Sequence, residues 1–293
     1  ILYRLVGSEM CIRDRETLPE DKSMSGMKIE LVGRDDLWTY KSCDNYNESP
    51  LTKSYVDAGK LPPVNERMPK EPWMAKTDQM VDGIGEYGGT FRHVIGGRPE
   101  GFNWLAGQSQ GWGGINIQLM ESLTRLGPLW QIKPDEANPL PNLAKDWEWS
   151  SDRKSLTMNL IEGARWSDGD IFDTEDIDFW WNDNVQDANV ASRLPKDALG
   201  AGTTLEILGP YSFKFNFDEP KGNAVLAQLA YMGGAPGPSH VMKPLHPAHN
   251  SDATYESYAN GMPASVLPIV TLGAYVPVVH KVDELMVMKR NPY

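Results

Sequence analysis

The sequence is poor in cysteine, in clustered basic residues and in long apolar runs. Its 293 residues include two cysteines, Cys11 and Cys43, which lack the spacing of a zinc site or a disulfide framework. Lys and Arg number 28 against 40 Asp and Glu, for a net charge of -12. No segment gathers the basic side chains that nucleic-acid phosphates require. We therefore expect no nucleic-acid partner.

No stretch approaches the roughly 20 apolar residues that span a bilayer, and no signal-peptide pattern opens the chain. Ile1–Arg15 resembles a peptide that recurs at the ends of unrelated metagenomic translations. We expect residues 1–15 to be a sequencing artefact in place of the native N-terminus; the alternative is an ordinary amphipathic leader. The native signal peptide is then not present in this chain, and its absence says nothing against secretion.

Nucleotide-binding and metal motifs are also lacking. There is no P-loop. The acidic cluster at 168–178 does not fit a calcium loop, because Ile171 and Phe172 fall where oxygen ligands are needed. Carboxylates in one turn also cannot face each other across a cleft as a glycosidase pair must. His246 and His249 have the i, i+3 spacing of metal ligands, but nearby prolines disfavour a regular helix. We predict no metal, no cofactor and no enzymatic activity.

The chain divides into a polar N-terminal part and a folded body. Residues 16–82 are polar and interrupted by prolines, which predicts an extension outside the core. Paired glycines then lead into the apolar run Phe91–Ile95, which predicts a buried strand. Apolar residues at helical spacing next predict an amphipathic helix, namely Ile115, Leu119, Met120 and Leu123.

Residues 156–181 combine a strand, a turn and the start of a helix. The first residues alternate with period two, as in a half-buried strand, with apolar Leu156, Met158 and Leu160. Asp168-Gly169 suits a turn that requires positive φ. Asp173 or Thr174 can cap the following helix, whose first turn is acidic. Further elements are predicted downstream: a hairpin of Thr204–Leu208 and Tyr211–Phe217, a helix at 223–229 and a strand at Leu285–Lys289.

The stretch TMNLIEGARWSDGDIFDTEDIDFWW, which begins at Thr157, resembles the signature of the family 5 extracellular solute-binding proteins, the peptide, dipeptide and nickel receptors of bacterial ABC importers. Family members read roughly "tFhLR.gvkWsDGtpfTaeDvvfsw" there. Further blocks resemble the family at 88–91, 141–148 and 285–293, the last being similar to its "NPdYw" ending. The resemblance covers roughly residues 85–293.

The resemblance implies an α/β fold of the periplasmic-binding-protein-like type II clamshell kind. Residues 83–104 and 236–293 would form the main part of lobe I, and residues 105–235 a subdomain inserted in it. In the family "NPdYw" comes about midway along the chain. We therefore expect this chain to be incomplete, with the second lobe missing.

The resemblance also implies a function. We expect a monomeric solute-binding receptor of an ABC importer, periplasmic or lipid-anchored, that delivers an oligopeptide to the permease subunits. Alternative ligands are a nickel chelate, an oligosaccharide or an opine. A carbohydrate-binding or carbohydrate-active enzyme domain and a regulatory ligand-sensing domain are the other classes that remain open.

The loop Arg98–Trp112 carries the residue types of a ligand site. Aromatic rings offer apolar contact, while amides and a hydroxyl can form hydrogen bonds with a solute. In the family the corresponding loop borders the cleft between the lobes. The resemblance therefore implies a ligand-binding set of Asn103, Trp104, Gln108, Ser109, Gln110 and Trp112. The alternative is that the two tryptophans fill the core and the polar side chains are solvated.

Overall fold

The computed structural model describes residues 31–33, 36, 38–40, 46–76, 88–94, 96–111, 115–126, 132–133, 138–230 and 232–293. Its α-helices are α3 (Pro50–Asp57), α4 (Val64–Arg67), α5 (Ile115–Leu119), α6 (Thr174–Asp178), α7 (Ala224–Gln228), α8 (Ser239–Met242) and α9 (Tyr255–Ala259). A π-helix at Phe179–Val185 continues α6, and 3₁₀ turns lie at Met232–Gly234 and Lys243–Leu245.

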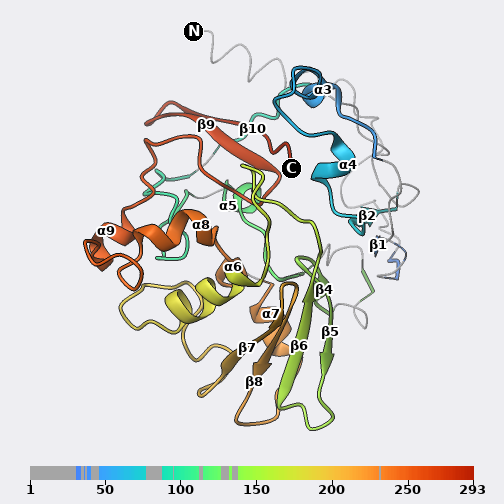
Figure 1. Cartoon of the computed structure of the whole chain (residues 1–293), viewed down its shortest axis with the longest axis vertical. Coiled ribbons are helices and arrows are strands. Elements are labelled where there is room, and N and C mark those ends of the chain that lie inside the picture. The colour runs from blue at the N-terminus through green and yellow to red at the C-terminus, as the bar shows by residue number, and fades with distance from the viewer. Residues whose placement is uncertain are drawn as a thin grey trace, which may run out of the picture.

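Its strands are β1 (Trp38–Tyr40), β2 (Trp73–Ala75), β3 (Thr124–Arg125), β4 (Leu140–Pro141), β5 (Ala144–Trp149), β6 (Ser155–Leu160), β7 (Thr204–Gly209), β8 (Ser212–Asn216), β9 (Tyr275–Lys281) and β10 (Leu285–Arg290). Figure 1 places the sheet of β5 to β8 at one end of the molecule and the β9–β10 hairpin at the other, with α6, α8 and α9 between them. The elements α3 and α4 lie along one side, beside the hairpin.

The main sheet is antiparallel, in the order β5-β6-β8-β7. Leu156 pairs with Phe215 and Met158 with Phe213, and all four side chains are buried. The predicted alternation at 156–160 is therefore confirmed, because one face of β6 packs on the core and the other faces outward. The predicted hairpin is confirmed as β7 and β8, and the predicted helix at 223–229 as α7.

The turn after β6 and the start of α6 also follow the prediction. Gly169 has a φ of +97°, which a side chain would strain. Asp173 is the N-cap of α6, and its carboxylate accepts a hydrogen bond from the backbone N–H of Glu175 at 2.7 Å. The π-helix then buries Trp180 and Trp181. The acids that suggested a metal loop therefore shape a turn and cap a helix.

A buried cation, Arg67, contributes to the attachment of the N-terminal extension to the body. The exposed helix α3 buries no residue, whereas Arg67 at the end of α4 is buried. Its guanidinium pairs with Glu48 at 2.5 Å and donates to the carbonyl oxygens of Pro62 and Pro292. One arginine thus joins the extension to the last residues of the chain.

Two expected elements differ in the structure. The helix predicted from Ile115 to Leu123 ends at Leu119, although Met120 and Leu123 are buried as expected. The strand predicted at 91–95 is wrong for residues 91–94, which form no strand, and Ile95 lies outside the described residues. Phe91 and Val94 are 86% and 88% exposed. A strand requires a neighbouring strand and a surface to bury its apolar side chains, and in the described structure residues 91–94 form part of no sheet and bury neither side chain.

Candidate ligand-binding site

Backbone contacts hold the loop that begins at Arg98 against residues 262–263. The backbone N–H of Phe102 donates to the carbonyl of Met262 at 2.7 Å, and Gly101 forms an isolated bridge with Pro263. Gly107 turns the loop back with a φ of +80°, and a Cβ there would lie 2.5 Å from the carbonyl oxygen of Ala191. Only glycine fits that position without displacement of the backbone.

Two of the predicted contact residues are buried within the protein. Asn103 is 0% exposed; its amide N–H donates to the carbonyl of Tyr258 at 2.7 Å, and its side-chain oxygen accepts from Ala106. Trp104 is 2% exposed, and its indole N–H donates to the carbonyl of Pro236 at 3.2 Å. In this arrangement both side chains use their hydrogen-bonding groups to hold the loop on its neighbours.

The remaining predicted residues differ in their access to solvent. Gln108 and Ser109 are half-buried, and the Gln108 amide donates to Asn260 at 3.2 Å. Gln110 is buried and donates to the carbonyls of Gly101 and Gln108, while its side-chain oxygen has no hydrogen-bond partner. Trp112 lies outside the described residues. Ligand contact by this loop stays a prediction, and Gln108 and Ser109 are the most accessible of the predicted contact residues that the structure describes.

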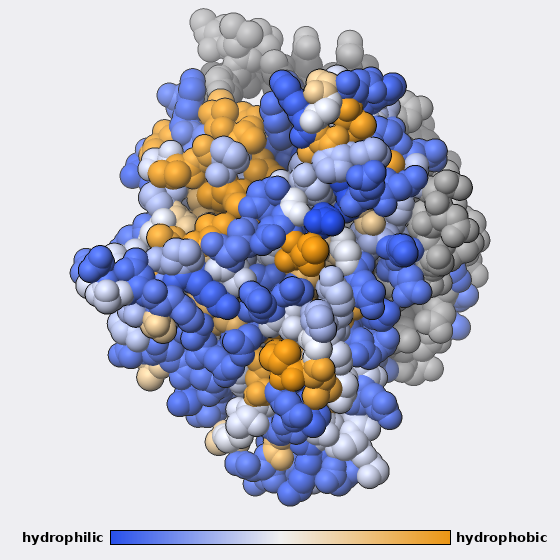
Figure 2. All heavy atoms as spheres, in the orientation of Figure 1, coloured by the Kyte–Doolittle hydropathy of each residue, from blue (hydrophilic) through white to orange (hydrophobic). Residues whose placement is uncertain are grey.

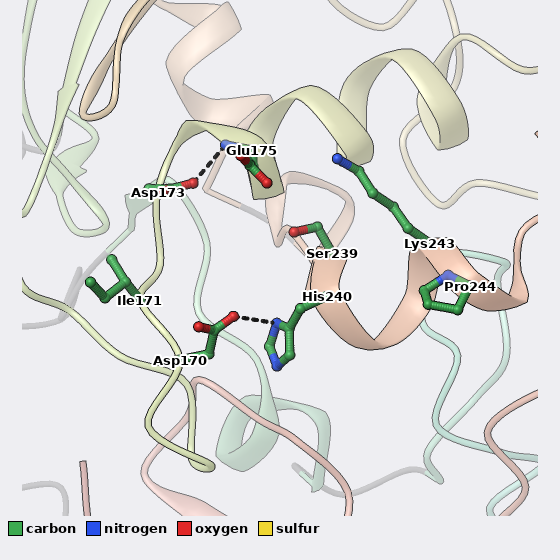
Figure 3. Close-up of a pocket in the computed structure, with 8 residues that line it drawn as sticks. All are labelled: Asp170, Ile171, Asp173, Glu175, Ser239, His240, Lys243 and Pro244. Atoms are coloured by element: carbon green, nitrogen blue, oxygen red, sulfur yellow. Dashed lines mark hydrogen bonds and ion pairs between the residues drawn. The ribbon is translucent and has the colours of Figure 1, made fainter. Parts of the chain in front are cut away.

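A cavity of about 460 Å³ opens between the start of α6 and the α8 segment (Figure 3). Four of its eight lining residues are charged and two are apolar; the lining comprises Asp170, Ile171, Asp173, Glu175, Ser239, His240, Lys243 and Pro244. Carboxylates, an imidazole and an ammonium can all form hydrogen bonds with a polyhydroxylated or charged solute, and the volume suits a small molecule. The sequence prediction assigned these acids to a turn and a helix face and overlooked the cavity.

His240 connects the two walls of this cavity. Its Nε2 lies 2.8 Å from a carboxylate oxygen of Asp168. Its Nδ1 lies 3.0 Å from a carboxylate oxygen of Asp170, and Figure 3 shows this second contact. The ring also packs beside the buried Trp166, with the ring centroids 6.5 Å apart. The conformation of the Asp-Gly turn and the position of α8 therefore depend on one another.

Two other titratable groups, Asp176 and Tyr258, are buried within the protein. Burial raises the pKa of the Asp176 carboxyl, although hydrogen bonds from Ser239 and Trp166 oppose the shift. Burial also raises the pKa of Tyr258, whose hydroxyl donates to Asn184 at 2.5 Å. Both groups are fully engaged within the protein, so their arrangement stabilises the fold and offers no free proton donor or acceptor to a solute.

The histidines considered as metal ligands lie together without forming a metal site. The rings of His246 and His249 are 6.2 Å apart, and His249 Nε2 lies 2.7 Å from the carboxylate of Asp183. Within the described ranges, no group of three or more His, Cys, Asp or Glu side chains is arranged to hold a metal ion. In the same ranges, no helix combines the length and apolar character needed to cross a bilayer.

The model of the "bacterial extracellular solute-binding proteins, family 5 Middle" matches residues 138–293, which is more than half of the chain. The chain belongs to this solute-binding family. The matched region contains the whole β5 to β8 sheet, the capped α6 helix and the β9–β10 hairpin. The family resemblance inferred from the signature at 157–181 is thereby confirmed.

Three relatives show what share of a family member's length this chain covers. The "Periplasmic alpha-galactoside-binding protein" of Rhizobium meliloti (strain 1021) is 48% identical over 91% of this chain, which covers 39% of that protein. The structure of the periplasmic binding protein MelB from Agrobacterium fabrum C58 in complex with stachyose superimposes with a TM-score of 0.87 at 45% identity, covering 94% of this chain and 42% of MelB. The oligopeptide-binding protein OppA superimposes with a TM-score of 0.63 at 27% identity, covering 85% of this chain and 38% of OppA.

The α/β periplasmic-binding-protein-like fold expected from the sequence is confirmed by these superpositions. The chain spans about two-fifths of the length of these relatives. The proposed division into lobe I at 83–104 and 236–293 and an inserted subdomain at 105–235 stays a prediction.

Proposed function

We propose that this chain is part of the solute-binding receptor of an ABC importer and that its ligand is an oligosaccharide. The observation that carries the proposal is the similarity to MelB, whose structure holds stachyose. The name of the Rhizobium meliloti relative, an alpha-galactoside-binding protein, points to the same ligand class. The oligopeptide-binding OppA is less similar. The alternative ligand named from the sequence, an oligosaccharide, therefore has better support than the peptide.

The receptor binds its solute and does not transform it. The matching family is described as solute-binding, and both sugar-related proteins are named as binding proteins. In the proposal the receptor is a periplasmic monomer that carries the sugar to the membrane permease. Binding would draw on contacts from the whole receptor, of which this chain supplies a part.

The sugar contacts within this chain are proposed to come from the loop at 98–112. Gln108 carries an amide and Ser109 a hydroxyl, and both residues are half-buried. Amides and hydroxyls are groups that can form hydrogen bonds with the hydroxyls of a sugar. Asn103 and Trp104 fix the position of the loop through hydrogen bonds to the backbone carbonyls of Tyr258 and Pro236. The cavity in Figure 3 is the competing location, since its charged lining could also contact a sugar.

The test uses a chimera in which this chain replaces the matching part of the Rhizobium meliloti relative. Calorimetry should show tight binding of stachyose by the chimera and weak or no binding by the isolated chain. A pool of short peptides should not bind. Tight binding of peptides without sugar binding would overturn the ligand assignment, and hydrolysis of stachyose by the chimera would favour the enzyme class instead.

A further inference from the structure

The loop at 98–112 has an internal network of hydrogen bonds. The backbone N–H of Glu100 donates to the carbonyl of Ser109 at 2.8 Å, and the Ser109 N–H donates to the Glu100 carboxylate at 2.8 Å. The side-chain amide of Gln110 donates to the carbonyl of Gln108 at 2.6 Å. These contacts define the shape of the loop. They join residues of the loop to one another, so they do not fix its position on the rest of the protein.

Another contact reaches a segment that lies 85 residues further along the chain. The Nη2 group of Arg193 donates to the carbonyl oxygen of Gln108 at 2.5 Å. A charged donor forms a shorter and stronger hydrogen bond than a neutral one. Beside Gln108, a Cβ added to Gly107 would lie 2.5 Å from the carbonyl oxygen of Ala191. The segment 190–194 therefore contacts the loop at two adjacent residues.

The segment that carries Arg193 is attached to the hydrophobic core. Leu194 is 2% exposed and belongs to the core, and Val190 packs against it. A Cβ added to Gly233 would lie 2.9 Å from the backbone nitrogen of Leu194, so these two stretches of backbone are in direct contact. Arg193 therefore connects the loop to a closely packed part of the protein.

The carbonyl oxygen of Gln108 has a second donor. A carbonyl has two lone pairs, and here one accepts from Arg193 and the other from Gln110. The other terminal nitrogen of Arg193, Nη1, lies 3.5 Å from the sulfur of Met232, which is a weak acceptor. Without Arg193 the carbonyl would still have Gln110 as a partner. The specific loss would be the hydrogen bond between the loop and the segment 190–194.

We infer that Arg193 is a positioning residue of the receptor, which fixes the loop at 98–112 on the segment 190–194. The loop is thereby held in the arrangement in which Gln108 and Ser109 contact the sugar. This inference rests on the proposed function, which gives those two residues their role. A loop that is already ordered loses less conformational freedom when the solute binds, so the affinity is higher. Arg193 acts through the loop and does not itself contact the sugar.

The test compares two substitutions of Arg193 in the chimera described above and in the isolated chain. R193M keeps an unbranched apolar side chain without a donor, whereas R193K keeps a charged donor. The matched control is R153M. Arg153 is half-buried, as Arg193 is, and its Nε donates to the carbonyl of Lys221 at 2.6 Å. Arg153 lies in the turn between β5 and β6, at the end of the sheet away from α8 and α9 (Figure 1). The surface at this end of the molecule is mostly hydrophilic (Figure 2).

The first measurement is calorimetric binding of stachyose by the chimera. R193M should bind about fivefold more weakly than the parent, R193K within about twofold of it, and R153M equally well. R193M should weaken binding less in a Q108A background than alone, because part of its effect passes through Gln108. An unchanged affinity in R193M would overturn the inference. A loss in Q108A alone would then leave the proposed role of the loop standing.

The second measurement is backbone hydrogen exchange at residues 102–109 of the isolated chain, which requires no ligand. Exchange in R193M should be at least about threefold faster than in the parent, because a loop without this anchor opens more often. R193K and R153M should stay close to the parent. Unchanged exchange in R193M would also overturn the inference. If the parent chimera does not bind stachyose, the proposed function fails, and exchange still decides whether Arg193 holds the loop.

Discussion

The indole N–H of Trp166 donates a hydrogen bond to the buried carboxylate of Asp176 at 2.9 Å. The same oxygen accepts from the backbone N–H of Asp173 at 3.3 Å, and the other accepts from the backbone N–H of Ser239 at 2.8 Å. One acid of the family signature therefore joins the Asp-Gly turn, the first turn of α6 and the start of α8. Its role is to position these elements.

Replacement of Asp176 by asparagine should destabilise the fold. An amide has one acceptor oxygen, so its NH₂ group would face a backbone or indole donor. Loss of such a buried hydrogen bond costs about 1–3 kcal/mol. Urea denaturation of D176N should give a free energy of unfolding that is lower by that amount, seen as a lower midpoint at unchanged slope. D178N on the same helix, where Asp178 is half-buried, is the control and should change little.

Replacement of Gly169 by alanine should also destabilise the chain. Gly169 has a φ of +97°, and an added Cβ would lie 2.8 Å from the Tyr293 hydroxyl oxygen. Strained backbone of this kind costs on the order of 1–3 kcal/mol. Gly222 is the matched control, because no atom lies within 4 Å of a Cβ there. Thermal unfolding should show G169A well below, and G222A close to, the parent protein; equal midpoints would contradict the prediction.

The free energy of unfolding should decrease as the pH is lowered through the range in which His246 takes up a proton. Burial lowers the pKa of this ring below its ordinary value of 6.5, despite the nearby carboxylates of Asp183 and Asp187, and His249 adds to the shift. Between the folded and unfolded pKa values, the unfolded state binds the proton more readily. The free energy of unfolding therefore decreases with falling pH in that window, by at most about 1.4 kcal/mol per pH unit for one proton.

The measurement is the urea unfolding free energy of the parent and of H246N as a function of pH below about 6.5. The backbone N–H of Ala248 donates to His246 Nδ1 at 3.1 Å. The side-chain amide introduced in H246N would keep an acceptor for that N–H and would remove the titration. We expect a shallower slope in H246N, whatever its absolute stability. An unchanged slope in H246N would refute the assignment.

Loop substitutions should separate sugar contact from loop support. In the chimera, Q108A or S109A should each weaken stachyose binding about fivefold, the loss of one hydrogen bond of about 1 kcal/mol, and should lower the unfolding midpoint less than N103A does. N103A should lower the midpoint as well, because Asn103 is buried and bonded to Tyr258.

The companion variant E175Q tests the cavity in Figure 3, where Glu175 is an exposed lining residue. If E175Q weakens stachyose binding and the loop variants do not, the sugar contacts the cavity and the loop assignment fails. Calorimetry and thermal unfolding of the same four variants provide both readouts.

The sequence by itself determined the local elements and the family. The alternation at 156–160, the Asp-Gly turn and the Asp173 cap each depend on residues within one strand, turn or helix end, so composition and spacing suffice to predict them. The signature at 157–181 likewise identified the family, which the matches over residues 138–293 and to long relatives confirm.

Only the tertiary structure decided which polar and aromatic side chains are accessible. Asn103 and Trp104 have the composition of a ligand site, but their partners, Tyr258 and Pro236, are more than 130 residues away in sequence. The exposure of Phe91 and Val94 was equally beyond prediction. Whether an apolar run becomes a buried strand depends on the neighbours that the rest of the polypeptide supplies, and local sequence carries no information on their position.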